Sequence, residues 1–185
     1  MNQPVMQAAP TAHDIRVAFE RIESDALQRE SAFERRALRN YLLHMLLAVS
    51  QRHDELFEFD TAAQEPDYVF FDSGKRVQGR QAIAAFHREQ AANNASLCVP
   101  VDQRVAMGAW GFAAEVTMYQ YLPDGTLHRT PSALVWRCDD KGRMKSLRFY
   151  PAAKHDTVRL AGTPVTTSDL AAELAPLVER LRQMK

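Results

Sequence analysis

The N-terminal part of the chain shows the spacing of an amphipathic helix. Apolar residues recur at i, i+4, i+7 and i+11, at Ile15, Phe19, Ile22 and Ala26. Side chains at this period share one face of an α-helix, and charged residues occupy the other faces. The pattern predicts a helix over residues 14 to about 34. It buries a single stripe, against the body of the domain or against a second subunit.

A second predicted helix, over about residues 34–53, is apolar around most of its circumference. Its central stripe and the residues that widen it are Leu38, Tyr41, Leu42, Leu43, Met45, Leu46, Leu47 and Val49. A helix with so wide an apolar surface is buried on several sides. We expect it to be the central helix, lying in the concavity of a curved sheet.

After residue 66 the pattern changes to extended segments. Aromatic and β-branched residues predict a strand over residues 68–71, and Gly79 precedes a third helix. Further strands are predicted within residues 97–107, 112–121, 127–137 and 144–150. Short Gly-containing turns join the last three strands, which indicates an antiparallel meander. Residues 151–167 read as a loop, and the final helix is expected to be capped by Ser168 or Asp169 and kinked or restarted at Pro176.

Composition excludes several classes of function. Lys+Arg and Asp+Glu are equal at 23 each, so no overall basic charge would hold nucleic acid or an anionic membrane. The longest apolar run, residues 41–49, is far shorter than the ~20 residues of a membrane span. Residues 1–11 read as a disordered polar tail without an export signal, so we expect a cytoplasmic protein.

Two kinds of bound group are not expected. The cysteines Cys98 and Cys138 stand apart from each other, with no Cys/His cluster that would suit a structural zinc ion. No phosphate-binding loop or dinucleotide fingerprint occurs in the sequence. The sequence therefore predicts neither a metal nor an organic cofactor.

Three motifs carry a resemblance to a known family. They are Asp-Tyr-Val-Phe-Phe-Asp (67–72), Gly-Arg-Gln-Ala-Ile-Ala-Ala-Phe (79–86) and Val-Trp-Arg-Cys-Asp-Asp-Lys-Gly-Arg-Met-Lys-Ser-Leu-Arg-Phe-Tyr (135–150). With the predicted order of elements, residues 34–153 resemble the nuclear transport factor 2-like superfamily, most of all its SnoaL-like and ketosteroid isomerase-like branch.

The resemblance implies a fold, an oligomeric state and a range of functions. The fold is a cone-shaped α+β domain, cystatin-like, in which a curved antiparallel sheet wraps around helices, usually as a homodimer. Here extra helices are expected at both ends: a single domain over residues 12–153, with an N-terminal helical extension, is followed by a loop and helix over residues 154–185. Members are cofactor-free isomerases, dehydratases, epoxide hydrolases and polyketide cyclases, and others are non-catalytic binding or assembly modules.

The candidate catalytic residues are Asp72, His44, Tyr41 and His128. Asp72 falls where the resemblance places the proton-shuttling acid of the isomerases, and the alternative is that it caps the turn at Ser73 and Gly74. Tyr41 and His44 are one helical turn apart and can project together into the pocket. His128 begins a strand whose even face suits a pocket lining, although its place near the start of that strand also fits the rim.

The same strand argues against one specific activity. The position at which ketosteroid isomerases keep a neutral acid corresponds here to Leu134, and a leucine donates no hydrogen bond to an enolate. The candidate substrate-binding residues are Tyr68, Phe70, Tyr119, Leu134 and Trp136. We therefore expect a cofactor-independent acid/base isomerase, dehydratase or cyclase acting on a small-to-mid-sized hydrophobic carbonyl compound. The alternative is a ligand-binding or dimeric assembly module without catalysis.

Overall fold

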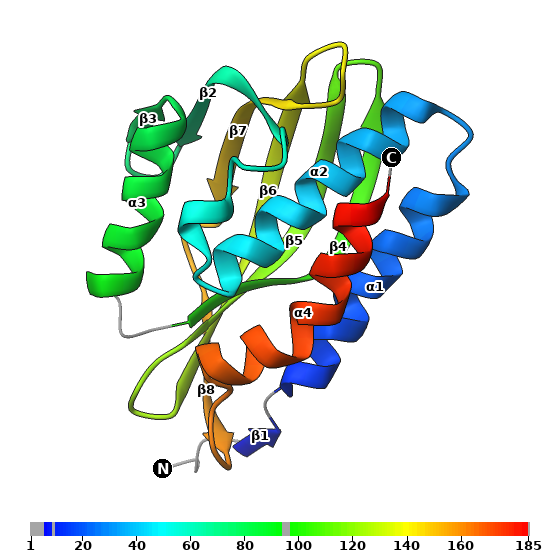
Figure 1. The fold of residues 1–185 in the computed structure, drawn as a ribbon. Helices are drawn as coiled ribbons and strands as arrows, with labels where there is room; N and C mark the ends of the chain where they lie inside the picture. Colours follow the sequence, from blue (N-terminus) through cyan, green and yellow to red (C-terminus); the bar gives the residue numbers. More distant parts are fainter. Residues whose placement is uncertain (1–5, 9, 94–96, 185) are drawn as a thin grey trace.

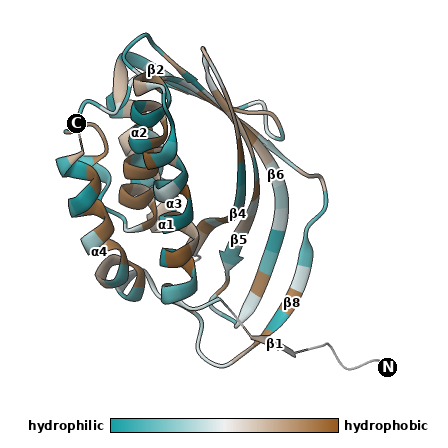
Figure 2. Ribbon diagram, turned by 90° about the vertical axis from the view of Figure 1, so that its right-hand side faces the viewer, coloured by the Kyte–Doolittle hydropathy of each residue, from teal (hydrophilic) through white to brown (hydrophobic). Residues whose placement is uncertain are grey.

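Helices cover one face of a bent sheet in this protein. The computed structural model describes residues 6–8, 10–93 and 97–184. Within these ranges four α-helices pack on an eight-stranded sheet, and Figure 2 shows the helices on one side of the sheet, which bends around them. None of the helices in these ranges is long and apolar enough to cross a membrane.

Helices make up most of the first half of the chain, and strands dominate the second (Figure 1). The order is β1 (Met6–Ala8), α1 (Ala12–Gln28), α2 (Ala32–Val49), a 3-10 turn (His53–Glu55), β2 (Ala62–Phe70), β3 (Arg76–Gln78), α3 (Arg80–Asn93), β4 (Leu97–Gly108), β5 (Gly111–Tyr121), β6 (Thr126–Cys138), β7 (Met144–Pro151), β8 (Asp156–Ala161) and α4 (Thr167–Gln183).

Strand β6 organises the sheet. It pairs antiparallel with β5 on one edge, and on the other edge with β8 near its start and β7 towards its end. The predicted meander from β5 to β7 is thus confirmed. The sheet is mixed rather than wholly antiparallel, because β2 runs parallel to β7 and β1 parallel to β8. A register shift in β4 between Val101 and Arg104 marks a bulge, the feature that bends strands.

The central position of α2 is confirmed by its burial. Ser31 caps the helix by accepting a hydrogen bond from the Glu34 amide. Leu42 and Leu46 have no exposed surface, and neither has Leu43 or Leu47 on the flank. The helix packs on the sheet through β4 and β7 and is bordered on its other sides by α1 and α4. Because α2 has neighbours on several sides, the residues that widen its apolar stripe are buried as well.

The apolar stripe of α1 is covered within the chain. Ile15, Phe19 and Ala26 are fully buried, and α1 contacts both α2 and α4. Arg16 reaches Glu173 of α4 at 2.7 Å, and Arg180 of α4 reaches Glu23 at 2.9 Å. Of the two arrangements predicted for this stripe, the structure shows packing within one subunit.

The terminal segments differ from the sequence-based expectation. Met6–Ala8 lies in the expected tail and Asp156–Ala161 in the expected loop, yet they form a parallel pair of strands; residues 1–5 and 9 lie outside the described residues. Each strand is too short for its periodicity to be recognised alone. Helix α4 runs through Pro176 without a break, capped by Thr166 and Asp169. Its buried leucine stripe offsets the ~3 kcal/mol typical of an interior proline.

Candidate functional site

A chain of three polar side chains runs through the interior between the helices and the sheet. His44 comes from α2, Tyr68 from β2 and His87 from α3. The Tyr68 hydroxyl is hydrogen-bonded to His44 Nε2 and lies 3.2 Å from His87 Nε2. We call His44, Tyr68 and His87 the histidine–tyrosine cluster.

Local structure explains how the cluster is assembled. The Gly79 amide donates to the Pro66 carbonyl at 2.8 Å, which fixes the start of α3 against β2. Gly79 has φ of +90°, a conformation that glycine adopts without strain. Ile83 is fully buried on the inner face of α3, and His87 lies one turn later on the same face. His87 is thereby brought beside Tyr68.

Aromatic rings surround the cluster. The His44 ring lies 5.5 Å from Trp136 and 5.8 Å from Phe57 between centroids. Tyr41, one turn before His44, packs edge-on against Trp136 at 5.2 Å. The surroundings are therefore predominantly apolar, with the polar atoms confined to a few positions, as in small-molecule sites.

Burial keeps the cluster uncharged. Desolvation lowers the pKa of His44 well below its usual range, and the neighbouring His87 lowers it further. Desolvation, aided by His53, lowers the pKa of His87 to about 4. Burial raises the pKa of Tyr68 far above the usual range of a phenol. Near pH 7 all three groups are neutral, so each ring nitrogen either donates or accepts according to the tautomer.

Buried polar atoms in and beside the cluster have no hydrogen-bond partner among the described residues. They include His44 Nδ1 and Gln103 Nε2, both without access to solvent. The Oε1 atom of Gln103 accepts a hydrogen bond from the Tyr41 hydroxyl. Because a buried polar group without a partner costs free energy, these atoms mark positions at which a bound polar group would be stabilised.

The structure brings together some of the predicted site residues. Tyr41, His44, Tyr68 and Trp136 are buried in or beside the cluster, and Phe70 packs against Tyr68 with 6.1 Å between ring centroids. The other predicted substrate-binding residues, Leu134 and Tyr119, lie in the core and at its margin respectively.

Asp72 and His128 do not join the cluster. Asp72 is exposed in the turn after β2, where its carboxylate accepts a hydrogen bond from the Ser73 hydroxyl at 3.4 Å. It lacks the apolar surroundings that its prediction as a general base required. His128 is half-buried and stacks on His155 at 4.1 Å. Their catalytic roles remain predictions.

Sequence reasoning missed His87 and His53. His87 lies four residues after the buried Ile83 on α3, and this spacing is the signal that could have placed it inward. His53 lies in the 3-10 turn after α2 and stacks on His87, at 5.7 Å and 20° between ring planes. No group of three or more His, Cys, Asp or Glu side chains suited to a metal ion occurs among the described residues.

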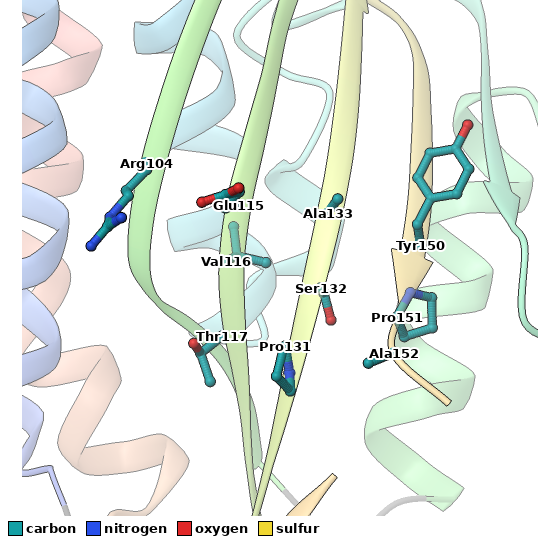
Figure 3. A pocket seen from close by; sticks show the side chains of 10 residues that line it. All are labelled: Arg104, Glu115, Val116, Thr117, Pro131, Ser132, Ala133, Tyr150, Pro151 and Ala152. Atoms are coloured by element: carbon teal, nitrogen blue, oxygen red, sulfur yellow. The ribbon is translucent and has the colours of Figure 1, made fainter. Parts of the chain in front are cut away.

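A groove of about 550 Å³ lies on the opposite face of the sheet. Figure 3 shows its lining side chains on neighbouring strands, with the helices beyond. Glu115, Pro131, Ala133 and Tyr150 are exposed there, whereas their neighbours Val116 and Leu134 face the core. Between residues 131 and 137, β6 thus turns Leu134 and Trp136 inward and Pro131, Ala133 and Arg137 outward.

Comparison with known proteins gives matches in structure alone. No protein-family profile matches the sequence, and no curated protein matches it. A candidate polyketide cyclase from Xanthomonas campestris pv. campestris matches over 64% of this chain and 92% of its own, with a TM-score of 0.54 and 16% sequence identity. A computationally designed 17-OHP binder matches over the same shares, with a TM-score of 0.50 and 13% identity.

A third structure is Δ5-3-ketosteroid isomerase from Mycobacterium sp., which matches over 62% of this chain and 92% of its own, with a TM-score of 0.48 and 18% identity. Identities this low show a shared fold. The α+β architecture that the resemblance implied is therefore confirmed, because the chain shares the fold of the Xanthomonas protein and of the designed binder.

Proposed function

We propose that this protein is a cofactor-independent acid/base catalyst that binds a small hydrophobic carbonyl compound beside His44 and moves a proton on it. One observation carries the proposal. The buried chain of hydrogen bonds from His87 through Tyr68 ends at His44, whose Nδ1 atom is fully buried and has no partner among the described residues.

The two possible directions of this chain give His44 two chemical roles. When the Tyr68 hydroxyl donates to His44 Nε2, the His44 proton is on Nδ1, which can donate to a carbonyl oxygen. When His44 Nε2–H donates to Tyr68 and Tyr68 donates to His87, Nδ1 is unprotonated and can accept a proton from the carbon next to the carbonyl. One imidazole thus serves as either acid or base.

The proton taken up at Nδ1 has a route out of the core. His44 passes its Nε2 proton to the Tyr68 oxygen, and Tyr68 passes its own proton to His87 Nε2. Because the pKa of His87 is lowered to about 4 by desolvation, protonated His87 releases a proton readily near pH 7. His87 is only half-buried, so this proton can leave to solvent.

The residues around His44 favour an apolar ligand. Trp136, Tyr41 and Tyr68 are buried, while Phe57, Phe86 and His87 are half-buried. Phe57 and Phe86 form a partly exposed wall against the cluster, and a ligand would reach His44 by displacing these two rings while His87 stays in place. Rings on this wall would pack against the hydrocarbon part of the compound.

Solvent hydrogen exchange tests the proposal without knowledge of the natural substrate. Cyclic ketones and enones are incubated with the protein in deuterium oxide, and deuterium uptake next to the carbonyl is followed by NMR. We expect exchange with at least one compound, and Tyr68→Phe should slow it by about 10²–10⁴-fold. Asp72→Asn is the matched comparison and should leave the rate unchanged.

Two results would contradict this assignment. If Tyr68→Phe still catalyses exchange and Asp72→Asn does not, the base is Asp72, as the sequence suggested. Exchange with none of the compounds would favour the second candidate, a non-catalytic homodimeric assembly module. That candidate is supported by Phe71 and Tyr150, exposed rings that stack at 4.2 Å at the margin of the outer groove.

A further inference from the structure

Half of the residues that line a second cavity, of about 660 Å³, are basic. The cavity lies where the first half of α2 meets the turn between β6 and β7 and the end of α4. Its charged lining residues are Arg35, Arg36, Arg39, Lys141, Arg143 and a single carboxylate, Asp60. We call this cavity the basic pocket. In a chain with a formal net charge of zero, such a concentration of positive charge is local.

Most of this charge is not neutralised within the protein. Arg143 is paired with Asp139 at 2.7 Å and with Asp60 at 3.1 Å. By contrast, Arg35, Arg36, Arg39 and Lys141 have no carboxylate within ion-pair distance among the described residues.

Backbone carbonyls hold two of these arginines in place. Arg35 Nη1 donates to the carbonyls of Arg29 and Glu30 at 2.6 and 2.7 Å. Arg39 Nε donates to the Leu181 carbonyl at 2.8 Å. A carbonyl orients a guanidinium and leaves its charge in place, so both side chains are fixed in position and still cationic.

The turn that carries Lys141 is also held firmly. Asn40 Nδ2 donates to the Gly142 carbonyl at 2.9 Å. Gly142 has φ of +72°, and a Cβ atom there would come within 3.0 Å of Arg36 Cβ and the Ala37 nitrogen. The close approach that only glycine allows places Lys141 beside Arg36 at the pocket.

Stability accounts for part of this arrangement, because Arg35 and Arg39 donate to carbonyls at the ends of α1 and α4, but it accounts for neither Arg36 nor Lys141. Arg35 and Arg36 lie within the first five residues of α2, near the positive end of the helix dipole. Cations are unfavourable there, whereas an anion is stabilised. The arrangement is therefore that of a site for a negative group.

Apolar side chains complete the lining. Leu27 is 58% exposed, the most exposed large hydrophobic residue in the described ranges, and Phe59 and Met184 are half-buried beside it. We propose that the basic pocket binds a small organic anion, in which a phosphate or carboxylate group contacts Arg36, Arg39 and Lys141 and an apolar group packs against Leu27 and Phe59. This site is separate from the histidine–tyrosine cluster and does not depend on the proposed catalysis.

Calorimetric titration with three simple probes tests the proposal. Phenyl phosphate carries both proposed features, inorganic phosphate carries the charge alone, and benzyl alcohol carries the ring alone. At constant ionic strength we expect phenyl phosphate to bind with a Kd of roughly 1 mM or below, inorganic phosphate more weakly, and benzyl alcohol not at all. Benzoate in place of phenyl phosphate shows which anionic group is preferred.

Substitutions at exposed residues test whether the probes bind in this pocket. The double variant Arg36→Gln with Lys141→Gln should weaken phenyl phosphate by at least about tenfold. Arg137→Gln, which removes an exposed charge from the outer face of the sheet, is the control and should bind as the unaltered protein does. Leu27→Ser should weaken phenyl phosphate while leaving inorganic phosphate unchanged.

Each of three results would overturn the proposal. The first is that phenyl phosphate does not bind at about 10 mM, a concentration tenfold above the expected Kd. The second is that the double variant and the control bind it equally well. The third is that benzyl alcohol binds as tightly as phenyl phosphate. Circular dichroism of the double variant checks that it is folded, and the exposed positions of Arg36 and Lys141 make a loss of structure unexpected.

Discussion

The buried histidines should make the protein lose stability in mildly acidic solution. In the unfolded chain His87 regains the ordinary pKa of about 6.5, whereas in the fold desolvation lowers the pKa to about 4. Between these values the unfolded state binds more protons than the folded state. Stability is therefore complete above about pH 6.5 and falls as the pH decreases towards 4.

The size of the effect follows from the two pKa values. From pH 7.5 to pH 5, protonation of His87 in the unfolded state alone should lower the free energy of unfolding by about 2 kcal/mol. The pKa of His44 is lowered in the same direction, by burial and by His87, so His44 adds to the loss. Against a typical total of about 5–15 kcal/mol, this change is large.

Urea denaturation at pH 7.5, 6.5 and 5 measures the loss. At pH 5 and above most carboxylates stay ionised in both states, so the histidines dominate the difference. His87→Gln removes one titrating group and should reduce the loss by about 2 kcal/mol, while His155→Gln, at an exposed histidine outside the cluster, should keep it. The reasoning fails if the unaltered protein is equally stable at pH 7.5 and 5, or if His87→Gln shows the same loss as the unaltered protein.

Two further predictions concern packing and assembly. Leu42→Ala or Leu46→Ala, both at fully buried positions, should each lower the free energy of unfolding by about 2–5 kcal/mol. The control Leu27→Ala should lower it by under about 0.5 kcal/mol. A loss below about 1 kcal/mol at Leu42 would show that α2 is not central. Sedimentation equilibrium at a protein concentration of roughly tens of micromolar should show a dimer. Ala133→Arg in the outer groove should dissociate this dimer, whereas the control Gln81→Arg, on the exposed side of α3, should not. A monomer of the unaltered protein at that concentration would refute assembly.

The fold was largely predictable because its main elements are long and periodic. Two predicted features are present in the structure: the wide apolar surface of α2 and the Gly-containing turns of the meander. The pairing of β1 with β8 was not predictable, since it joins two short segments about 150 residues apart in sequence and depends on tertiary contacts that no local pattern carries.

The site was predictable only in part, for a related reason. Tyr41 and His44 are placed correctly by helical spacing, and Tyr68 by the alternation of a strand. The position of Asp72 depends on the length of a turn, and in the structure that turn carries its side chain outward into solvent. His87 comes near His44 only because α3 docks on β2 (Figure 1), so the partnership of the two histidines is not visible along the chain.

The packing of α1 under α4 has a consequence for synthesis on the ribosome. The stripe that contains Ile15 and Phe19 is covered in part by α4, which begins at Thr167. The stripe therefore leaves the ribosome long before α4 has been synthesised. Until translation is almost finished, the nascent chain exposes an apolar helix face that can recruit chaperones or stick to other chains. Messages truncated before α4 should accordingly yield insoluble products, although every strand of the sheet is already encoded.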